Sequence, residues 1–272
     1  MLVQVLFFIA LIGGGAAYAQ SGASVEPYDR IVDVNGYRLF LKVQPGTQPE
    51  LPTVILESGG GADSSQWSQL QATLSTQTGA TVVSYDRPGF GKSDLPEEPY
   101  DIRDESRAFH EALDSLGLAR NILLVGHSYG GFLIQLYAST WPATVRGLLF
   151  LDPNTPSFML AAGAEGAPPP IRNPTSPRGR ALARIDAAGM ASYSAVFQAQ
   201  LPLNIPVIVV SAETPPVDQP RLVRAFQLSH ELLAASVHDG KRIIAEGSNH
   251  MITAQRPDLV VDAVKELLAK TP

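Results

Sequence analysis

The chain has 272 residues, a formal net charge of −6 and no cysteine. The negative charge argues against nucleic-acid binding, and the lack of cysteine excludes disulfides, zinc–thiolate sites and cysteine nucleophiles. With 45% hydrophobic and 17% charged residues, the composition is typical of a globular domain with a sizeable core.

The first residues of the chain predict a secretory signal peptide. Residues 2–12 are almost wholly apolar, and Ala17-Tyr18-Ala19 fits the A-x-A pattern that precedes cleavage. This apolar stretch is short for a bilayer span, although no Lys or Arg precedes Arg30, and an uncleaved anchor is the alternative. We expect removal of residues 1–19, a mature domain at 20–272, and a secreted or periplasmic protein without a stable membrane anchor.

A hairpin and a glycine loop come first in the mature chain. The β-rich runs at residues 31–34 and 37–43 flank Asn35-Gly36, a turn sequence that predicts a hairpin. Residues 53–56 predict a buried strand that runs into Ser58-Gly59-Gly60-Gly61. Such a glycine run leaves backbone N–H groups free to receive an anion, and a flexible loop is the alternative.

Strands and helices then alternate. Apolar runs predict buried strands at residues 81–85 and 121–125, and the spacing of apolar residues predicts helices at 66–74, 102–116 and 132–138. This alternation favours a mainly parallel sheet that is covered by helices on both faces.

The stretch Gly126-His127-Ser128-Tyr129-Gly130 lies between one of these strands and the next helix and reads G-x-S-x-G. A sharp turn from strand to helix strains the backbone, and the flanking glycines lack the Cβ atoms that would clash. The turn places the Ser128 hydroxyl above the sheet at the positive end of the helix. Because this position suits a reaction that develops negative charge, Ser128 is the predicted nucleophile, although the bare motif also arises by chance.

A second motif carries a family resemblance. The segment from Asp86 to Ser93 reads D-R-x-G-x-G-x-S after a strand. Together with the later G-H-S-x-G, it resembles the α/β-hydrolase fold family, over nearly the whole chain after about Asp29. The resemblance implies that the Asp-Arg-Pro-Gly segment is a structural turn near the active site, and we assign it no chemistry.

The resemblance also implies an oxyanion hole. Its donors would be the N–H of Tyr129, which follows the nucleophile, and an N–H of the glycine loop. Aligning Ser58-Gly59-Gly60 with the family's usual His-Gly-x points to Gly60. Ser58 replaces the family's histidine, but the donor is a backbone group, so we expect the oxyanion hole to be retained.

The second half of the chain predicts three more strands, about eight in all, at residues 145–151, 206–210 and 241–245, with helices at 221–236 and 257–270. Residues 153–205 are rich in Pro, Ala and Gly, with helical patterns only around 179–188 and 191–200. The resemblance implies that this insertion is a cap over the active site, and a disordered loop is the alternative.

The base and the acid of a catalytic triad are expected at the carboxyl ends of strands. Of the five histidines, His250 alone lies in the loop between the last strand and the last helix, where the resemblance places the catalytic histidine. Asp152 and Glu213 both give the chain order serine, acid, histidine. In most of the family the acid follows the penultimate strand, where the equivalent residue is Thr214. We therefore predict Asp152, with Glu213 as the alternative acid.

Taken together, the sequence predicts a serine hydrolase that cleaves a small carboxylic ester, or another acyl substrate, through an acyl-enzyme intermediate. The reaction needs neither a metal nor an organic cofactor. A lactone hydrolase or an N-terminal-proline amide hydrolase with the same triad is an alternative, as is a ligand-binding sensor with little turnover. Relatives that process halides or epoxides carry Asp at the nucleophile position, and Ser128 argues against that chemistry.

Overall fold

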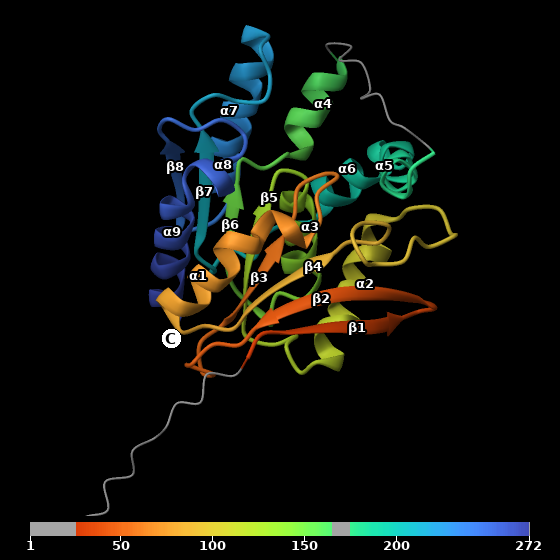
Figure 1. Cartoon of the computed structure of the whole chain (residues 1–272). Helices are drawn as coiled ribbons and strands as arrows, with labels where there is room; N and C mark the ends of the chain where they lie inside the picture. Colours follow the sequence, from red (N-terminus) through yellow and green to blue (C-terminus); the bar gives the residue numbers. More distant parts are fainter. Residues whose placement is uncertain (1–25, 165–174, 272) are drawn as a thin grey trace, which may run out of the picture.

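The computed structural model describes residues 26–164 and 175–271, and in this part of the chain an eight-stranded sheet is the central feature (Figure 1). The strand order is β1-β2-β4-β3-β5-β6-β7-β8. Only the pairs β1–β2 and β2–β4 are antiparallel, so the predicted mainly parallel α/β fold is confirmed. The predicted signal peptide at residues 1–19 lies outside the described residues.

The predicted hairpin forms the edge of this sheet. β1 (Tyr28–Val34) pairs with β2 (Tyr37–Gln44), and the turn residues Asn35 and Gly36 both have positive φ angles, of 52° and 90°. Two such residues in succession are characteristic of the tight turns whose twist matches that of the flanking strands. The Asn-Gly sequence therefore explains both the turn and the pairing register.

The six inner and far-edge strands run parallel to one another. They are β3 (Thr53–Glu57), β4 (Val82–Asp86), β5 (Ile122–His127), β6 (Val145–Leu151), β7 (Val207–Ala212) and β8 (Gly240–Ala245). His127 is paired with Leu151, and Leu151 with Val210. The residues that follow β5, β6 and β7 therefore emerge side by side at one edge of the sheet.

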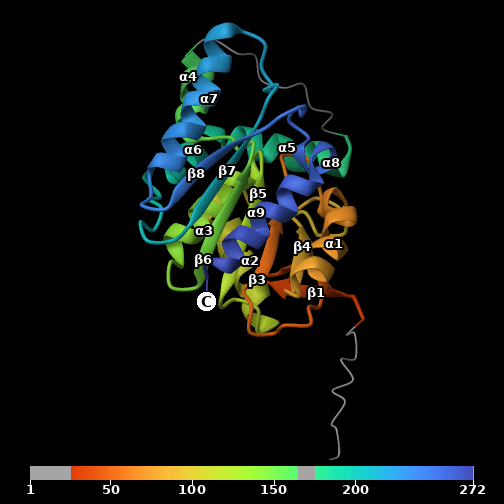
Figure 2. The same ribbon diagram turned by 90° about the vertical axis from the view of Figure 1, so that its left-hand side faces the viewer.

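Helices cover both faces of the sheet (Figure 2). On one face, α2 (Ile102–Ser115), α3 (Gly130–Thr140) and α7 (Pro220–Ala235) contribute side chains such as Phe109, Tyr137 and Ala234 to a buried cluster. On the other face, α1 (Ser68–Thr78) and α9 (Pro257–Ala269) bury Leu74 and Val264 against β3, β5 and β7.

The helix predicted at residues 66–74 differs from the observed one. A short 3-10 helix, η1 (Ser64–Trp67), comes first, and the side chain of Asp63 caps it by accepting a hydrogen bond from Ser65 N–H. α1 then continues to Gly79, whose φ of 78° ends it. Because only glycine adopts this backbone conformation readily, Gly79 rather than the last apolar residue sets the helix end.

The insertion between β6 and β7 contains three described helices, beyond the carboxyl ends of the strands (Figure 1). Two of them, α5 (Pro177–Ala187) and α6 (Gly189–Gln198), match the two predicted helical patterns. The third, α4 (Pro156–Ala164), was not predicted and packs on α7 through the rings of Phe158 and Phe226, whose centres are 4.8 Å apart. In the described segments, none of the helices is long and apolar enough to cross a membrane.

Candidate active site

Ser128 lies on the sharp turn between β5 and α3. Its φ angle is 53°, a left-handed backbone conformation that residues with a side chain rarely adopt. The two flanking glycines are required by close contacts: a Cβ on Gly126 would lie 2.7 Å from the Gly130 oxygen, and one on Gly130 would lie 2.6 Å from the Glu57 oxygen. The turn is thus packed tightly against β3, and it leaves Ser128 with 8% of its surface exposed.

Asp152 and His250 form a direct pair. His250 Nδ1 lies 2.7 Å from Asp152 Oδ2, while Asp152 Oδ1 accepts a hydrogen bond of 2.9 Å from Ala212 N–H. Asp152 is fully buried and has a strained φ of 42°, whereas the His250 side chain is 25% exposed. Both carboxylate oxygens are therefore occupied, and the carboxylate holds the imidazole ring in one orientation.

Backbone hydrogen bonds join the Ser128 turn to the Asp152 turn. Ser128 N–H donates to the Leu151 oxygen at 3.0 Å, and Asn154 N–H donates to the Ser128 oxygen at the same distance. Because both turns are tied to each other, their side chains keep a fixed relative position. Residues 24 positions apart in the sequence thus become neighbours in space, as the parallel pairing of β5 and β6 requires.

Glu213, the alternative acid, takes a different position. Its carboxylate accepts a hydrogen bond of 2.7 Å from Gly247 N–H, and the residue is exposed. Glu213 therefore stabilises the loop that leads to His250, whereas Asp152 contacts the imidazole itself.

The two residues expected to donate to an oxyanion face each other. A Cβ on Gly60 would lie 3.5 Å from the Tyr129 Cβ. In the described part of the chain, neither Gly60 N–H nor Tyr129 N–H donates to another backbone group. Ser58, which replaces the family's histidine, accepts a hydrogen bond from Trp67 Nε1 at 2.9 Å and donates one to the Asp63 oxygen at 3.0 Å. The Ser58 hydroxyl thus links the glycine loop to Trp67 and to the Asp63 backbone.

A family model described as Alpha/beta hydrolase family matches residues 54–263, which is most of the chain. The chain belongs to the alpha/beta hydrolase family. The solved structures agree in fold: haloalkane dehalogenase DatA from Agrobacterium tumefaciens C58 superposes with a TM-score of 0.65 over 90% of this chain and 97% of that one, at 16% identity.

Curated relatives of this hydrolase match over shorter stretches. A (lyso)-N-acylphosphatidylethanolamine lipase of Bos taurus is 33% identical over 115 residues, which cover 41% of this chain and 32% of the relative. The 1-acylglycerol-3-phosphate O-acyltransferase ABHD5 of Sus scrofa is 30% identical over 124 residues, covering 44% and 34%. The aligned part of the hydrolase thus spans only about a third of these relatives.

His127, the residue before Ser128, contacts the His250 loop of this hydrolase site. Its Nε2 lies 2.8 Å from the His250 carbonyl oxygen, and the two imidazole ring centres are 4.7 Å apart. Burial, together with the nearby His250, lowers the pKa of His127 to about 4. The ring is therefore neutral at ordinary pH, and Nε2–H donates to the carbonyl. The residue before Ser128 thus holds the backbone of the His250 loop.

A second serine–histidine pair also lies beside Asp152 in this hydrolase. Ser211 Oγ is 2.9 Å from His230 Nδ1, and His230 Nδ1 is 4.0 Å from Asp152 Oδ1. The contacts resemble a triad, but Ser211 is 1% exposed and His230 is fully buried. Since His230 Nε2 lies 2.8 Å from the Pro153 carbonyl and must donate to it, Nδ1 accepts the Ser211 proton. No sequence signal beyond the location of Ser211 at the end of β7 points to this pair.

Proposed function

We propose that the protein is a serine hydrolase that cleaves carboxylic esters through an acyl-enzyme intermediate. Ser128 is the nucleophile, His250 the general base and Asp152 the acid that orients it. The 2.7 Å contact between His250 Nδ1 and Asp152 Oδ2, at the same sheet edge as the strained Ser128 turn, is the observation that carries the proposal.

The chemistry follows from this arrangement. Asp152 holds the proton of His250 on Nδ1, so Nε2 carries the lone pair that takes the Ser128 proton. The alkoxide attacks the ester carbonyl, and Gly60 N–H and Tyr129 N–H stabilise the negative oxygen that forms. Collapse expels the alcohol with the proton from the imidazolium, and water then releases the acid by the same steps in reverse.

The Ser211–His230 pair is too deeply buried to act on a substrate itself. A nucleophile has to reach a substrate carbonyl, and Ser211 has almost no exposed surface. Its hydroxyl is also the acceptor of a hydrogen bond of 2.9 Å from Arg242 Nε. We infer that this pair holds the Asp152 turn in place through the Pro153 carbonyl and takes no part in bond making.

The two serines give a matched test. Ser128→Ala is expected to abolish turnover of p-nitrophenyl acetate and leave the folding transition unchanged, because the elbow serine contributes chemistry. Ser211→Ala removes the same hydroxyl from the buried pair, and we expect it to retain measurable turnover with a lowered melting temperature. If Ser128→Ala keeps near wild-type kcat while Ser211→Ala loses it, the buried set is the active site and our proposal is wrong.

The relatives favour one class of acyl group in the substrate. Both curated relatives named above carry acyl lipids in their names, which favours an ester of a fatty acid over a lactone or an N-terminal-proline amide. Turnover measured over p-nitrophenyl esters of increasing chain length, beside a lactone and a prolyl amide, ranks these substrate classes. The absence of turnover on every one of them would instead favour a ligand-binding protein.

We further propose that α4, α5 and α6 act as a cap that shapes the substrate pocket. Leu182 and Val196 of this insertion pack in one cluster with Tyr129 and Phe132. A Cβ on Gly61, next to the proposed oxyanion donor, would lie 3.4 Å from Leu182. The insertion thus contacts both walls of the proposed oxyanion hole, and changes at Leu182 are expected to alter which esters are cleaved.

A further inference from the structure

Arg87, in the segment to which the sequence assigned no chemistry, is a fully buried arginine. Its Nε lies 3.8 Å from Glu57 Oε1 at the end of β3 and 3.8 Å from Glu105 Oε1 on α2. Burying a charge is costly unless partners offset the loss of water. We therefore expect this buried ionic cluster to have a role other than packing.

The guanidinium of Arg87 contacts both walls of the proposed oxyanion hole. Its Nη2 donates a hydrogen bond of 3.2 Å to the Gly59 carbonyl, and this carbonyl belongs to the same peptide unit as Gly60 N–H. The guanidinium carbon also lies 4.9 Å from the centre of the Tyr129 ring. One side chain thus restrains the peptide that carries the first donor and the residue that carries the second.

The charges of the cluster favour an anion nearby. Burial raises the pKa of Glu57 to about 8, against the opposing effect of Arg87. Burial acts to lower the pKa of Arg87, but the neighbouring Glu105 and Glu57 raise it by more, so the guanidinium keeps its charge. The charged guanidinium lies beside the glycine loop, where positive charge favours a developing oxyanion.

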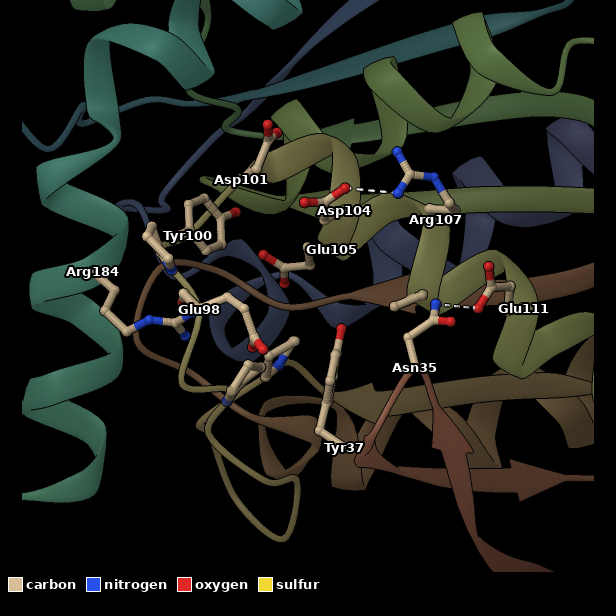
Figure 3. Close-up of a pocket in the computed structure, with 14 residues that line it drawn as sticks. Asn35, Tyr37, Glu98, Tyr100, Asp101, Asp104, Glu105, Arg107, Glu111 and Arg184 are labelled. Carbon is tan, nitrogen blue, oxygen red and sulfur yellow. Dashed lines mark hydrogen bonds and ion pairs between the residues drawn. The ribbon is translucent and has the colours of Figure 1, made fainter.

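Glu105 and Tyr100 close the cluster on its outer side. Figure 3 shows both residues among the lining of a pocket of about 450 Å³ that includes none of the proposed triad residues. The Tyr100 hydroxyl lies 2.9 Å from the Tyr129 hydroxyl, so the wall of this pocket also supports Tyr129. The carboxylate-rich rim of the pocket includes paired groups, such as Asp104 with Arg107 at 2.7 Å, and we assign it no ligand.

We propose that Arg87 is a positioning residue of the hydrolase: it holds the Gly59 carbonyl and the Tyr129 ring so that Gly60 N–H and Tyr129 N–H point at one oxyanion. This inference rests on the proposed reaction at Ser128. A purely structural Arg87 would change the amount of folded protein. A positioning Arg87 changes the rate of each folded molecule, because donors displaced by about 1 Å stabilise the transition state poorly.

The test compares the turnover of p-nitrophenyl acetate by Arg87→Gln with that by the wild type. Active sites are counted with diethyl p-nitrophenyl phosphate, which releases one p-nitrophenol for each nucleophile that it phosphorylates. We expect kcat per active site to fall about 10- to 100-fold and KM to stay within about threefold. The affinity for a butylboronic acid, which forms a tetrahedral adduct, is expected to fall by the same factor as kcat.

Tyr85→Phe is the matched control. The Tyr85 hydroxyl donates a hydrogen bond of 2.6 Å to Glu57 Oε2 in the same cluster, and within the described residues no hydrogen bond joins it to the glycine loop. Its loss is expected to lower the melting temperature without changing kcat per active site. This control separates damage to the buried cluster from displacement of the oxyanion donors.

Three results would contradict either the positioning role of Arg87 or the role of Ser128 as nucleophile. If Arg87→Gln keeps kcat per active site within twofold of the wild type, Arg87 only stabilises the fold. If that variant does not fold, Arg87→Lys keeps the charge but lacks the planar guanidinium that contacts the Gly59 carbonyl and the Tyr129 ring together, and a wild-type kcat per site overturns the inference. If Ser128→Ala still releases stoichiometric p-nitrophenol, the proposed nucleophile itself is wrong, whatever Arg87 does.

Discussion

The two oxygens of the Asp152 carboxylate have different hydrogen-bond partners, a backbone amide and an imidazole. Ala212 N–H occupies Oδ1 at 2.9 Å, so only Oδ2 remains for His250 Nδ1. An amide at this position would present an oxygen to one partner and an NH₂ group to the other. Because Ala212 can only donate, the NH₂ group would face His250 and force the wrong imidazole tautomer.

The first prediction follows from this geometry. Asp152→Asn is expected to lower kcat by ~10⁴, the typical loss when a triad aspartate is amidated. Glu213→Gln is the matched control: it neutralises the other candidate acid, which contacts Gly247 N–H, and it should lower kcat far less. Steady-state kinetics on a p-nitrophenyl ester measure both. A larger loss for Glu213→Gln would show that the acid follows β7.

The second prediction concerns the pH dependence of folding at Glu57. Burial raises its pKa from 4.5 to about 8, so the folded protein binds this proton over a range in which the unfolded chain releases it. The stability contribution of the buried neutral carboxyl is therefore fully present below about pH 4.5 and is lost as the pH rises through about 8.

The variant Glu57→Gln removes this titration. We expect the free energy of unfolding of the wild type to fall relative to that of the variant between pH 5 and pH 9, because only the wild type has to ionise a buried group. Urea unfolding at pH 5, 7 and 9 measures the difference. A difference that stays constant over this range would contradict the raised pKa. Glu266→Gln, at an exposed pair with Lys241, serves as the control for a surface carboxyl.

Among the elements, the β5–α3 turn is closely restricted by its neighbours. A Cβ on Gly130 would meet the backbone oxygens of Glu57 at 2.6 Å and Ser58 at 2.9 Å. Backbone atoms cannot yield as a flexible side chain can. The third prediction is therefore that Gly130→Ala destabilises the protein by about 1–3 kcal/mol, as overpacking typically does, and lowers kcat by displacing the glycine loop.

The control for this prediction lies on α4. An added Cβ at Gly163 meets nothing within 4 Å, and alanine at a helix position is expected to stabilise by about 0.5–1 kcal/mol. Thermal unfolding of Gly130→Ala and Gly163→Ala is thus expected to shift in opposite directions. Equal shifts would mean that the effect is one of backbone entropy and not of contact.

The sequence predicted the sheet, its alternating helices and the location of Ser128, because these depend on local periodicity and turn chemistry. It missed α4, whose residues are apolar or small throughout, so that no polar face marks a helical period. The acid stayed open between Asp152 and Glu213, because which carboxylate reaches His250 depends on how β6 and β7 pair. Arg87 was read as part of a turn, since its partners Glu57 and Glu105 are distant in the sequence and charged residues are usually exposed.

At the scale of the whole molecule, the fourth prediction concerns export. If residues 1–19 act as a signal peptide, the exported protein begins at Gln20. Expression of the full chain in a bacterium, followed by amino-terminal sequencing of the periplasmic and cytoplasmic fractions, tests this directly. An exported protein that still begins with Met1 would refute cleavage. Replacing Ala17 and Ala19 by bulky residues is expected to block processing.

The location of the proposed acid at the end of β6 also has a consequence for engineering. The connection from β7 to α7 then carries no proposed catalytic residue. Only its first part supports the site: Ala212 N–H donates to Asp152, and the Glu213 carboxylate accepts from Gly247 N–H. Val217 in this connection packs partly buried against the cluster of Phe158 and Phe226, but Asp218 and Gln219 after it are exposed and lie outside regular structure. Exposed loop tips tolerate inserted sequence well. An affinity tag or a small domain inserted between Asp218 and Gln219 would let the hydrolase be immobilised or fused without using either terminus.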